Sequence, residues 1–216
     1  MKSLCVFCLI GSFVLFTSCG IFISKKSEQR PLPTTPETVS PVFASKPVYV
    51  SPFMTRATQA RNYSLQNNFS TKYCFFVDMS IHSGRNRFFV YDLEKNIVLL
   101  SGLVAHGSCK QGFLDEAKFS NVPGCGCSSL GKYRIGEKYR GQYGISYKLY
   151  GLESTNSNAY KRAVVLHGLS CVPNNEIYPR VVCNSLGCAM VSPGFFQQLA
   201  FIIDNSKKPV VLWIYS

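Results

Sequence analysis

The stretch NSLGCAMVSPG, residues 184–194, joins a reactive side chain to the start of a helix. Cys188 follows Gly187, and glycine lets the backbone approach a ligand closely because it has no Cβ atom. Ser192 followed by Pro193 is typical of a helix N-terminus, with serine as the cap and proline at the first helical position. Apolar residues then recur at helical spacing, at positions 195, 196, 199, 202 and 203. The stretch therefore predicts a turn that carries Cys188, followed by a helix with one apolar face.

Short β-favouring runs make up most of the chain outside this stretch. They read YCFFVDM, RFFVYDL, NIVLLSGLVA, GKYRIG, ISYKLYG, AVVLH and PVVLWIY, and turn signals such as Ser83-Gly84 and Pro123-Gly124 separate them. A chain of 216 residues has room for one sizeable core plus appendages. The predicted fold class is mainly β, as a sandwich or a partly open barrel with one C-terminal helix.

A nucleophilic Cys188 needs a base, because free cysteine has a pKa of about 8.5 and only the thiolate attacks. The chain has three histidines. His82 lies in a polar turn and is expected to be a solvated surface residue. His106 and His167 each end a β run and precede a glycine, which would place them at a sheet edge. Catalytic and structural roles are both open for these two.

The chain contains ten cysteines, at positions 5, 8, 19, 74, 109, 125, 127, 171, 183 and 188. Without the first three and Cys188, six remain, an even number that is typical of disulfides in an oxidising compartment. The pairing of Cys171 with Cys183 would close one loop. The alternatives are reduced, buried thiols and a zinc site.

The zinc alternative would use Cys125 and Cys127 with Cys109 and His106. The spacing of one residue between the first two is shorter than the usual two to four, and no second close pair completes the site. We therefore expect no metal, and the predicted chemistry requires no organic cofactor.

The N-terminal region predicts export. Residues 1–19 contain a charged start, the apolar run LCVFCLIGSFVLF and a small-residue exit, and the run is shorter than the roughly 20 residues of a membrane-spanning helix. Cys19 resembles the acylated cysteine of a bacterial lipobox; a plain secretory signal is the alternative. Residues 20–72 are rich in Pro, Ser and Thr and predict a disordered tether. Residues 73–216 form the predicted catalytic domain.

The formal net charge of +12 indicates an affinity for polyanions. The cations are dispersed, and no aromatic-basic RNA motif or recognition helix stands out, so we expect no nucleic-acid partner. An exported protein meets anionic lipid and anionic wall polymer first. The oligomeric state is left open.

The segment VVLHG, followed by Ser185, Gly187 and Cys188 in an S-x-G-C turn, resembles the signature of the YkuD-type L,D-transpeptidases. The chain is similar to the branch called the murein L,D-transpeptidase catalytic domain family. The resemblance extends from about residue 76 to residue 215, through VDMSIHSGRNRFFVYDLEKN, LVAHGS, FSN, SSLGKYRIGEKYRGQYGISYKLYGLE and LWIY. It departs from many relatives at Leu186, where a second histidine or a tryptophan is common.

The resemblance implies a role for each motif residue. Cys188 would be the nucleophile and His167 its base, and the Gly187 and Cys188 amides would be the oxyanion donors. Ser185 would support the loop. His106 would line the donor pocket or orient His167, with a structural role as the alternative. Pairing with histidine is expected to lower the pKa of the cysteine.

The implied reaction is acyl transfer on peptidoglycan stem peptides through a Cys188 thioester. An amine of a second stem would resolve the thioester and form a 3→3 crosslink, whereas water would give carboxypeptidase activity and a protein amine would give anchoring. The partners would be stem peptides and, through a lipid on Cys19, the membrane, in the periplasm or cell envelope. A non-catalytic wall-binding lipoprotein with Cys188 in a disulfide is the alternative. A cysteine peptidase acting on proteins is weaker, because no papain-type motif surrounds Cys188.

Overall fold

The computed structural model describes residues 51–216. This part of the chain forms two helices and nine strands. The helices are α1 (Ser51–Gln66) and α2 (Pro193–Asp204). The strands are β1 (Tyr73–Asp78), β2 (Phe88–Asp92), β3 (Ile97–Gly102), β4 (Val104–Ala105), β5 (Gly131–Gly141), β6 (Gly144–Gly151), β7 (Val165–Gly168), β8 (Ala189–Val191) and β9 (Val211–Tyr215). The predicted mainly β class with a C-terminal helix is confirmed. No helix in this range is both long and apolar enough to cross a membrane.

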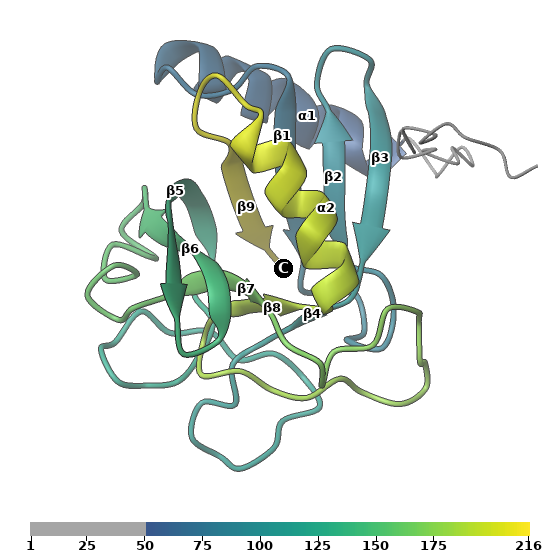
Figure 1. Cartoon of the computed structure of the whole chain (residues 1–216), viewed down its shortest axis with the longest axis vertical. Helices are drawn as coiled ribbons and strands as arrows, with labels where there is room; N and C mark the ends of the chain where they lie inside the picture. The colour runs from purple at the N-terminus through teal and green to yellow at the C-terminus, as the bar shows by residue number, and fades with distance from the viewer. Residues whose placement is uncertain (1–50) are drawn as a thin grey trace, which may run out of the picture. The chain divides into compact units, whose positions relative to one another are not determined.

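The described strands form a single open sheet in the order β3-β2-β1-β9-β5-β6-β7-β8-β4. Most neighbours pair antiparallel, whereas β1 pairs parallel with β9 and β7 pairs parallel with β8. The strand that precedes α2 and the strand that follows it therefore lie far apart in the sheet. Figure 1 shows α2 lying across one face of the sheet and α1 behind the other.

The middle of strand β1, residues 74–77, is continuously apolar because both faces of the strand are covered. Phe75 and Val77 belong to the cluster that includes the α2 side chains. Cys74 and Phe76 point the other way, into the cluster that includes α1. A strand buried on both faces reads as a continuous apolar run, and YCFFVD has this pattern.

The helix α2 begins as its sequence predicts. Ser192 is the N-cap, and its hydroxyl accepts a hydrogen bond from the amide of Phe195 at 3.2 Å. The buried residues of the helix are Phe195, Phe196, Leu199 and Ile202. Ile203, which the pattern also places on the apolar face, is only partly buried and packs at the edge of the same cluster.

The helix α1 corrects the predicted tether, which was expected to continue to residue 72. Its buried side chains are Phe53, Ala57, Ala60 and Ser64, one stripe at helical spacing. Three of the four are small, so the stripe gives little hydrophobic signal in the sequence. Phe53 anchors the helix on the sheet, with its ring centroid 4.8 Å from that of Phe89. Residues 1–50, which include the predicted export signal, Cys19 and the rest of the tether, lie outside the described residues.

The described cysteines form two disulfides. Cys171 pairs with Cys183, which confirms the predicted loop closure, and Cys109 pairs with Cys127. Because Cys109 and Cys127 are bonded to each other, they are not available as the thiolate ligands of the zinc alternative. Cys74, Cys125 and Cys188 are free, so the six remaining cysteines do not all pair. Cys74 is fully buried in the α1 cluster, and burial raises its pKa strongly, so it is an apolar core residue.

Candidate active site

The parallel pair β7 and β8 brings the two motifs of the sequence together. His167 on β7 is the register partner of Met190 on β8. Cys188 precedes Met190 by two residues, and alternate side chains along a strand point to the same side. The register therefore directs Cys188 and His167 toward the same side of the sheet, although 21 residues separate them in sequence.

Both side chains line one cavity with a volume of about 350 Å³. Its walls come from the loop after β4, the tip of the β5–β6 hairpin and the segment that leads into β8. The lining residues are Ser108, Gly112, Phe113, Tyr143, His167, Leu169, Cys183, Asn184, Ser185, Leu186, Cys188 and Met190. This volume lies at the lower end of the range for small-molecule sites. The loops that surround the site lie at the bottom of Figure 1.

The hydrogen bonding of His167 defines its tautomer. Its Nδ1 atom lies 3.3 Å from the carbonyl oxygen of Gly168, which can only accept, so Nδ1 carries the proton. The Nε2 atom of the neutral ring is then free to accept a proton. Burial lowers the pKa of His167 below its ordinary value of 6.5. The imidazole is therefore neutral at pH 7, the form that a general base requires.

Cys188 is a free, half-buried thiol. Its Sγ atom lies 4.0 Å from the carbonyl oxygen of Ala163. Burial raises its pKa, and the backbone of Val165 and the charge of Arg162 only partly oppose this effect. No hydrogen bond joins Cys188 to His167 within residues 51–216, a common situation in a site without substrate. The expected lowering of the cysteine pKa is thus wrong for this conformation, and the resting pair is a neutral thiol beside a neutral imidazole.

Ser185 holds the turn that carries Cys188. Its hydroxyl accepts a hydrogen bond from the amide of Gly187 at 3.0 Å and donates one to the carbonyl of Cys188 at 2.9 Å. Gly187 has a φ of +108°, and a Cβ atom there would lie 2.6 Å from the carbonyl oxygen of Cys127. Only glycine fits this position.

The same hydrogen bond corrects the expected role of the Gly187 amide. That amide is committed to Ser185 Oγ, so it does not face the cavity as an oxyanion donor. The Cys188 amide has no hydrogen-bond partner among the described residues and remains a candidate donor. The positive φ of Gly187 goes with a turn in which its amide points toward the Ser185 hydroxyl. The spacing of residues in the sequence does not predict this hydrogen bond.

His106 does not line the cavity, in contrast to its expected substrate-binding role. It is fully buried. The guanidinium of Arg87 donates to its Nδ1 atom at 2.9 Å, so Nε2 carries the proton and donates to the carbonyl of Leu114 at 3.1 Å. Burial, with the neighbouring charge of Arg87, lowers the pKa of His106 to about 4. Both ring nitrogens are occupied, which supports the structural alternative.

His106 acts on the site through the loop that it holds. Leu114 donates its amide to Asn184 Oδ1 at 2.6 Å and accepts from Asn184 Nδ2 at 3.0 Å. Asn184 lines the cavity and precedes Ser185, whose amide donates to the carbonyl of His106 at 2.8 Å. The buried histidine thus ties the end of β4 to one wall of the cavity and to the turn that carries Cys188.

Sequence reasoning missed Tyr143, Arg162 and Arg87. Tyr143 lies at the tip of the β5–β6 hairpin, between glycines, where an aromatic side chain in a turn is a signal for a role in binding. Arg162 donates to the carbonyls of Cys127 and Ser120 and so joins the segment before β7 to the loop behind Gly187. Arg87 is buried and donates to the carbonyl of Val104, and its sequence context gives no comparable signal.

A half-buried thiol in the turn before β8 and a neutral imidazole on β7 line one cavity and define a candidate site for cysteine-dependent acyl transfer. The chain belongs to the L,D-transpeptidase catalytic domain family, whose model matches residues 45–215. This membership confirms the family to which the sequence motifs pointed.

Solved structures similar to this chain include three from bacteria. The helical cell shape determining protein Pgp2 from Campylobacter jejuni is 11% identical, with a TM-score of 0.45, over 72% of this chain and 55% of that one. An L,D-transpeptidase from Xylanimonas cellulosilytica is 13% identical, with a TM-score of 0.39, over 71% and 68%. One from Mycobacterium smegmatis is 12% identical, with a TM-score of 0.38, over 67% and 59%. The chain thus spans between about half and two thirds of their lengths. No curated protein matches the sequence.

Proposed function

We propose that the protein is a cysteine acyltransferase that acts on peptidoglycan stem peptides and forms 3→3 crosslinks or, with water as the acceptor, acts as an L,D-carboxypeptidase. The observation that carries this proposal is the shared cavity of Cys188 and His167, with the Nε2 atom of His167 free to accept a proton. Family membership supplies the substrate class.

The first half of the proposed reaction forms a thioester. His167 Nε2 accepts the thiol proton as Cys188 Sγ attacks the carbonyl of the diamino acid at stem position three. The Cys188 amide stabilises the negative charge on the carbonyl oxygen. The bond to the terminal D-alanine then breaks, and the imidazolium returns its proton to the departing amine.

The second half transfers the acyl group. An amine of a second stem attacks the thioester carbonyl, gives its proton to His167, and displaces Cys188 Sγ, which takes the proton back. Water in place of the amine releases a shortened stem. Because the thiol and the imidazole are both neutral at rest, the proton moves during each attack rather than before it.

The test is mass spectrometry of the purified full chain after incubation with disaccharide-tetrapeptide, with and without a carbapenem. Dimer, shortened monomer and acylated protein differ in mass. Cys188→Ala should abolish product and adduct, and His167→Ala should slow both by orders of magnitude. Cys125→Ala is the matched control, since it removes another free thiol and should change neither. Full activity of Cys188→Ala would defeat the proposal.

The alternative of a non-catalytic wall-binding lipoprotein required Cys188 to be in a disulfide. Cys188 is free, so that condition is not met here. Thiol titration followed by peptide mapping of the oxidised protein separates the two functions. A bridged Cys188 in the mapped protein would favour the wall-binding protein.

We also propose that the chain is exported and anchored through a lipid on Cys19. The sequence features of residues 1–19 support this proposal. Expression of the full chain in a bacterium, followed by fractionation and intact-mass measurement, tests it. Cys19→Ala should move the protein from the membrane fraction to the soluble fraction and remove the added lipid mass. An unchanged distribution would indicate that Cys19 is not the anchor.

A further inference from the structure

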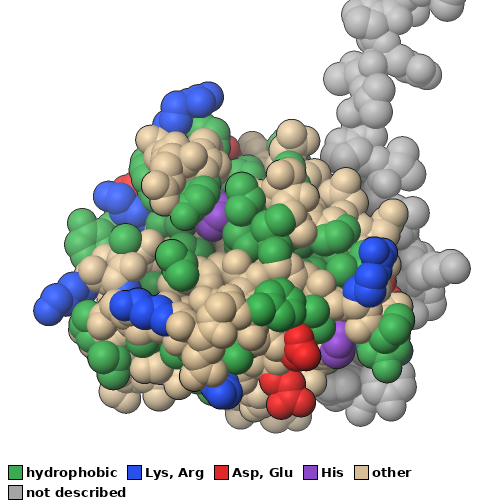
Figure 2. All heavy atoms as spheres, turned by 90° about the horizontal axis from the view of Figure 1, so that it is seen from below, with side chains coloured by type: hydrophobic (Ala, Val, Ile, Leu, Met, Phe, Trp, Pro, Cys, Tyr) green, Lys and Arg blue, Asp and Glu red, His purple; other side chains and the backbone are tan. Residues whose placement is uncertain are grey.

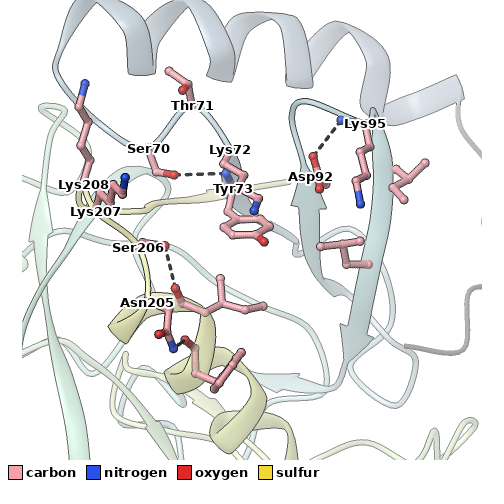
Figure 3. A pocket seen from close by; sticks show the side chains of 14 residues that line it. Ser70, Thr71, Lys72, Tyr73, Asp92, Lys95, Asn205, Ser206, Lys207 and Lys208 are labelled. Carbon is pink, nitrogen blue, oxygen red and sulfur yellow. Dashed lines mark hydrogen bonds between the residues drawn. The ribbon is translucent and has the colours of Figure 1, made fainter. Parts of the chain in front are cut away.

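A second cavity, with a volume of about 700 Å³, shares no lining residue with the cavity of Cys188. It opens between the α1–β1 connection, the strand β3 and the C-terminal end of α2 (Figure 3). Five of its lining residues give it an apolar surface: Tyr73, Ile97, Leu99, Phe201 and Ile202. Phe201 is 58% exposed and Ile97 is 39% exposed, so two large apolar side chains stand at its mouth. The volume lies within the range for sites that hold small organic ligands.

Four lysines surround this apolar surface: Lys72, Lys95, Lys207 and Lys208. None of them forms an ion pair with any residue of the described part of the chain. The one carboxylate in the lining, Asp92, is buried, and its Oδ1 atom accepts the amides of residues 94 and 95 at the turn after β2. The cavity therefore presents an excess of unpaired positive charge.

The C-terminal end of α2 does not oppose this charge with free carbonyls. Helix C-termini carry partial negative charge on unsatisfied carbonyl groups. Here the side-chain amide of Asn205 donates to the carbonyl of Phe201 at 2.7 Å, and the hydroxyl of Ser206 donates to the carbonyl of Ile202 at 2.7 Å. Because these two carbonyl groups of α2 are hydrogen-bonded, the four lysines are the dominant charges at the mouth of the cavity.

An apolar surface surrounded by four lysines favours a ligand with an apolar body and an anionic head group. A hydrophilic polyanion would leave the apolar floor exposed to water, and a purely apolar ligand would leave four lysines unpaired. Lysines beside exposed aromatic and aliphatic side chains are the pattern of surfaces that contact anionic membranes. On the face shown in Figure 2, by contrast, the Lys and Arg side chains lie apart from one another.

This cavity is separate from the candidate active site. The two lie near opposite ends of α2: Gly168, beside His167, lies near Pro193 and Phe196, whereas the cavity is lined by Phe201, Ile202, Asn205 and Ser206. A helix of 12 residues is about 18 Å long. A ligand in this cavity would therefore leave Cys188 accessible.

We propose that the cavity between the α1–β1 connection, β3 and the end of α2 binds an anionic lipid, with its apolar part against Phe201 and Ile97 and its head group among the four lysines. The proposal does not depend on the acyl-transfer function. Binding there would hold the catalytic domain against a lipid surface with the Cys188 cavity directed elsewhere.

The test compares vesicle binding of full-length variants. Vesicles of phosphatidylglycerol mixed with phosphatidylcholine, and of phosphatidylcholine alone, are sedimented with the wild-type chain and with Lys207→Glu/Lys208→Glu. Every variant keeps the apolar N-terminal run, so that run contributes equally and the difference reports the cavity. Each lysine near an anionic surface contributes about a fivefold increase in binding. The double variant removes both contributions and adds two negative charges, so it should bind anionic vesicles at least about 30-fold more weakly and neutral vesicles unchanged.

Two controls separate this site from general electrostatic attraction. Lys110→Glu/Lys161→Glu makes the same change in net charge at exposed positions outside the cavity and should weaken binding less than about threefold. Phe201→Ser removes the exposed apolar rim without changing charge and should weaken anionic-vesicle binding about tenfold. Turnover of soluble stem peptide should be unchanged in Lys207→Glu/Lys208→Glu and in Phe201→Ser.

Two results would overturn the proposal. Equal losses in the cavity variant and the Lys110/Lys161 control would mean that only net charge matters. Unchanged vesicle binding of Phe201→Ser, together with weaker binding of soluble polyglutamate by Lys207→Glu/Lys208→Glu, would identify a polyanion surface instead of a lipid site.

Discussion

The ring of Tyr143 stacks on the imidazole of His167, with ring centroids 4.4 Å apart and an interplanar angle of 18°. Tyr143 lies at the tip of the β5–β6 hairpin and lines the cavity of Cys188. The stack covers one face of the imidazole and contributes to the burial that keeps it neutral. The position of the β5–β6 hairpin tip therefore affects the orientation and the solvent exposure of His167, the proposed base.

Tyr143→Phe should keep near-normal activity, because the ring stacks without its hydroxyl. Tyr143→Ala should lower kcat/KM about tenfold to a hundredfold, because the imidazole loses a neighbour that fixes its orientation. It should also raise the pKa of His167 toward 6.5, since water reaches the ring. Stem-peptide turnover against pH measures both effects. Equal activity of the two variants would show that the stack has no role.

The pH profile of the reaction should have an acidic limb below pH 6.5. Burial lowers the pKa of His167, so the imidazole loses its capacity to accept a proton only when the pH falls below that lowered value. The value of kcat/KM should be flat through pH 7 and fall as the pH decreases further. A half-maximal point at or above pH 6.5 would contradict the assignment of His167 as a buried, neutral base.

Ser185→Ala should lower kcat about a hundredfold with little change in the folded structure. The variant frees the Gly187 amide and the Cys188 carbonyl, so the turn loses both hydrogen bonds that position Sγ. Ser185→Thr keeps the hydroxyl and is the conservative control. Partial rescue by threonine, with equal melting temperatures for all three proteins, would identify a positioning role. Normal turnover of Ser185→Ala would exclude it.

His106 should make the protein less stable as the pH falls from 6.5 to about 4. Its pKa is about 4 in the folded state and 6.5 in the unfolded chain, so the unfolded chain binds the additional proton within this window. The loss amounts to roughly 3 kcal/mol and is complete below pH 4. His106→Gln can accept from Arg87 and donate to Leu114 without titrating.

Denaturant unfolding at several pH values measures this contribution. The wild type should lose more stability than His106→Gln between pH 6.5 and 4, and the two proteins should lose it in parallel below that range. Identical pH dependence in the two proteins would show that His106 is not held neutral by the fold.

The two free, partly buried thiols should differ in reactivity. Burial opposes ionisation of Cys125, but hydrogen bonds from the amide of Cys127 and from the Ser120 side chain, together with the charge of Arg162, lower its pKa. Burial raises the pKa of Cys188. Iodoacetamide at pH 7 should therefore modify Cys125 faster than Cys188 in the protein without substrate, as read by peptide mass spectrometry. A carbapenem should modify Cys188 alone, because only that thiol has a base. Faster alkylation of Cys188 would indicate a preformed thiolate.

The fold was predictable where the hydrophobic pattern was strong. All seven β-favouring runs correspond to strands, and the run at residues 96–105 contains both β3 and β4. The helix α1 was missed because Ala57, Ala60 and Ser64 give a weak apolar stripe. The strand β8 was missed because it has only three residues, and its pairing with β7 is a long-range choice that periodicity does not contain.

The candidate site was predictable in its reactive groups but not in its hydrogen bonds. The motif spacing pointed to Cys188 and His167, which line the same cavity. The commitment of the Gly187 amide to Ser185 depends on a positive φ, and the burial of His106 depends on Arg87, which is distant in sequence. Side-chain partners of this kind are defined by the tertiary fold.

The parallel register of β7 with β8 has a consequence for how this enzyme family can vary. Because the sheet sets the separation of the base from the nucleophile, the connecting segment of residues 169–184 need not have a particular length. That segment is closed by the Cys171–Cys183 bridge into a loop of its own. Homologues should therefore tolerate insertions at its exposed positions, and a short peptide inserted between Asn174 and Asn175, within the bridged loop, should leave turnover intact.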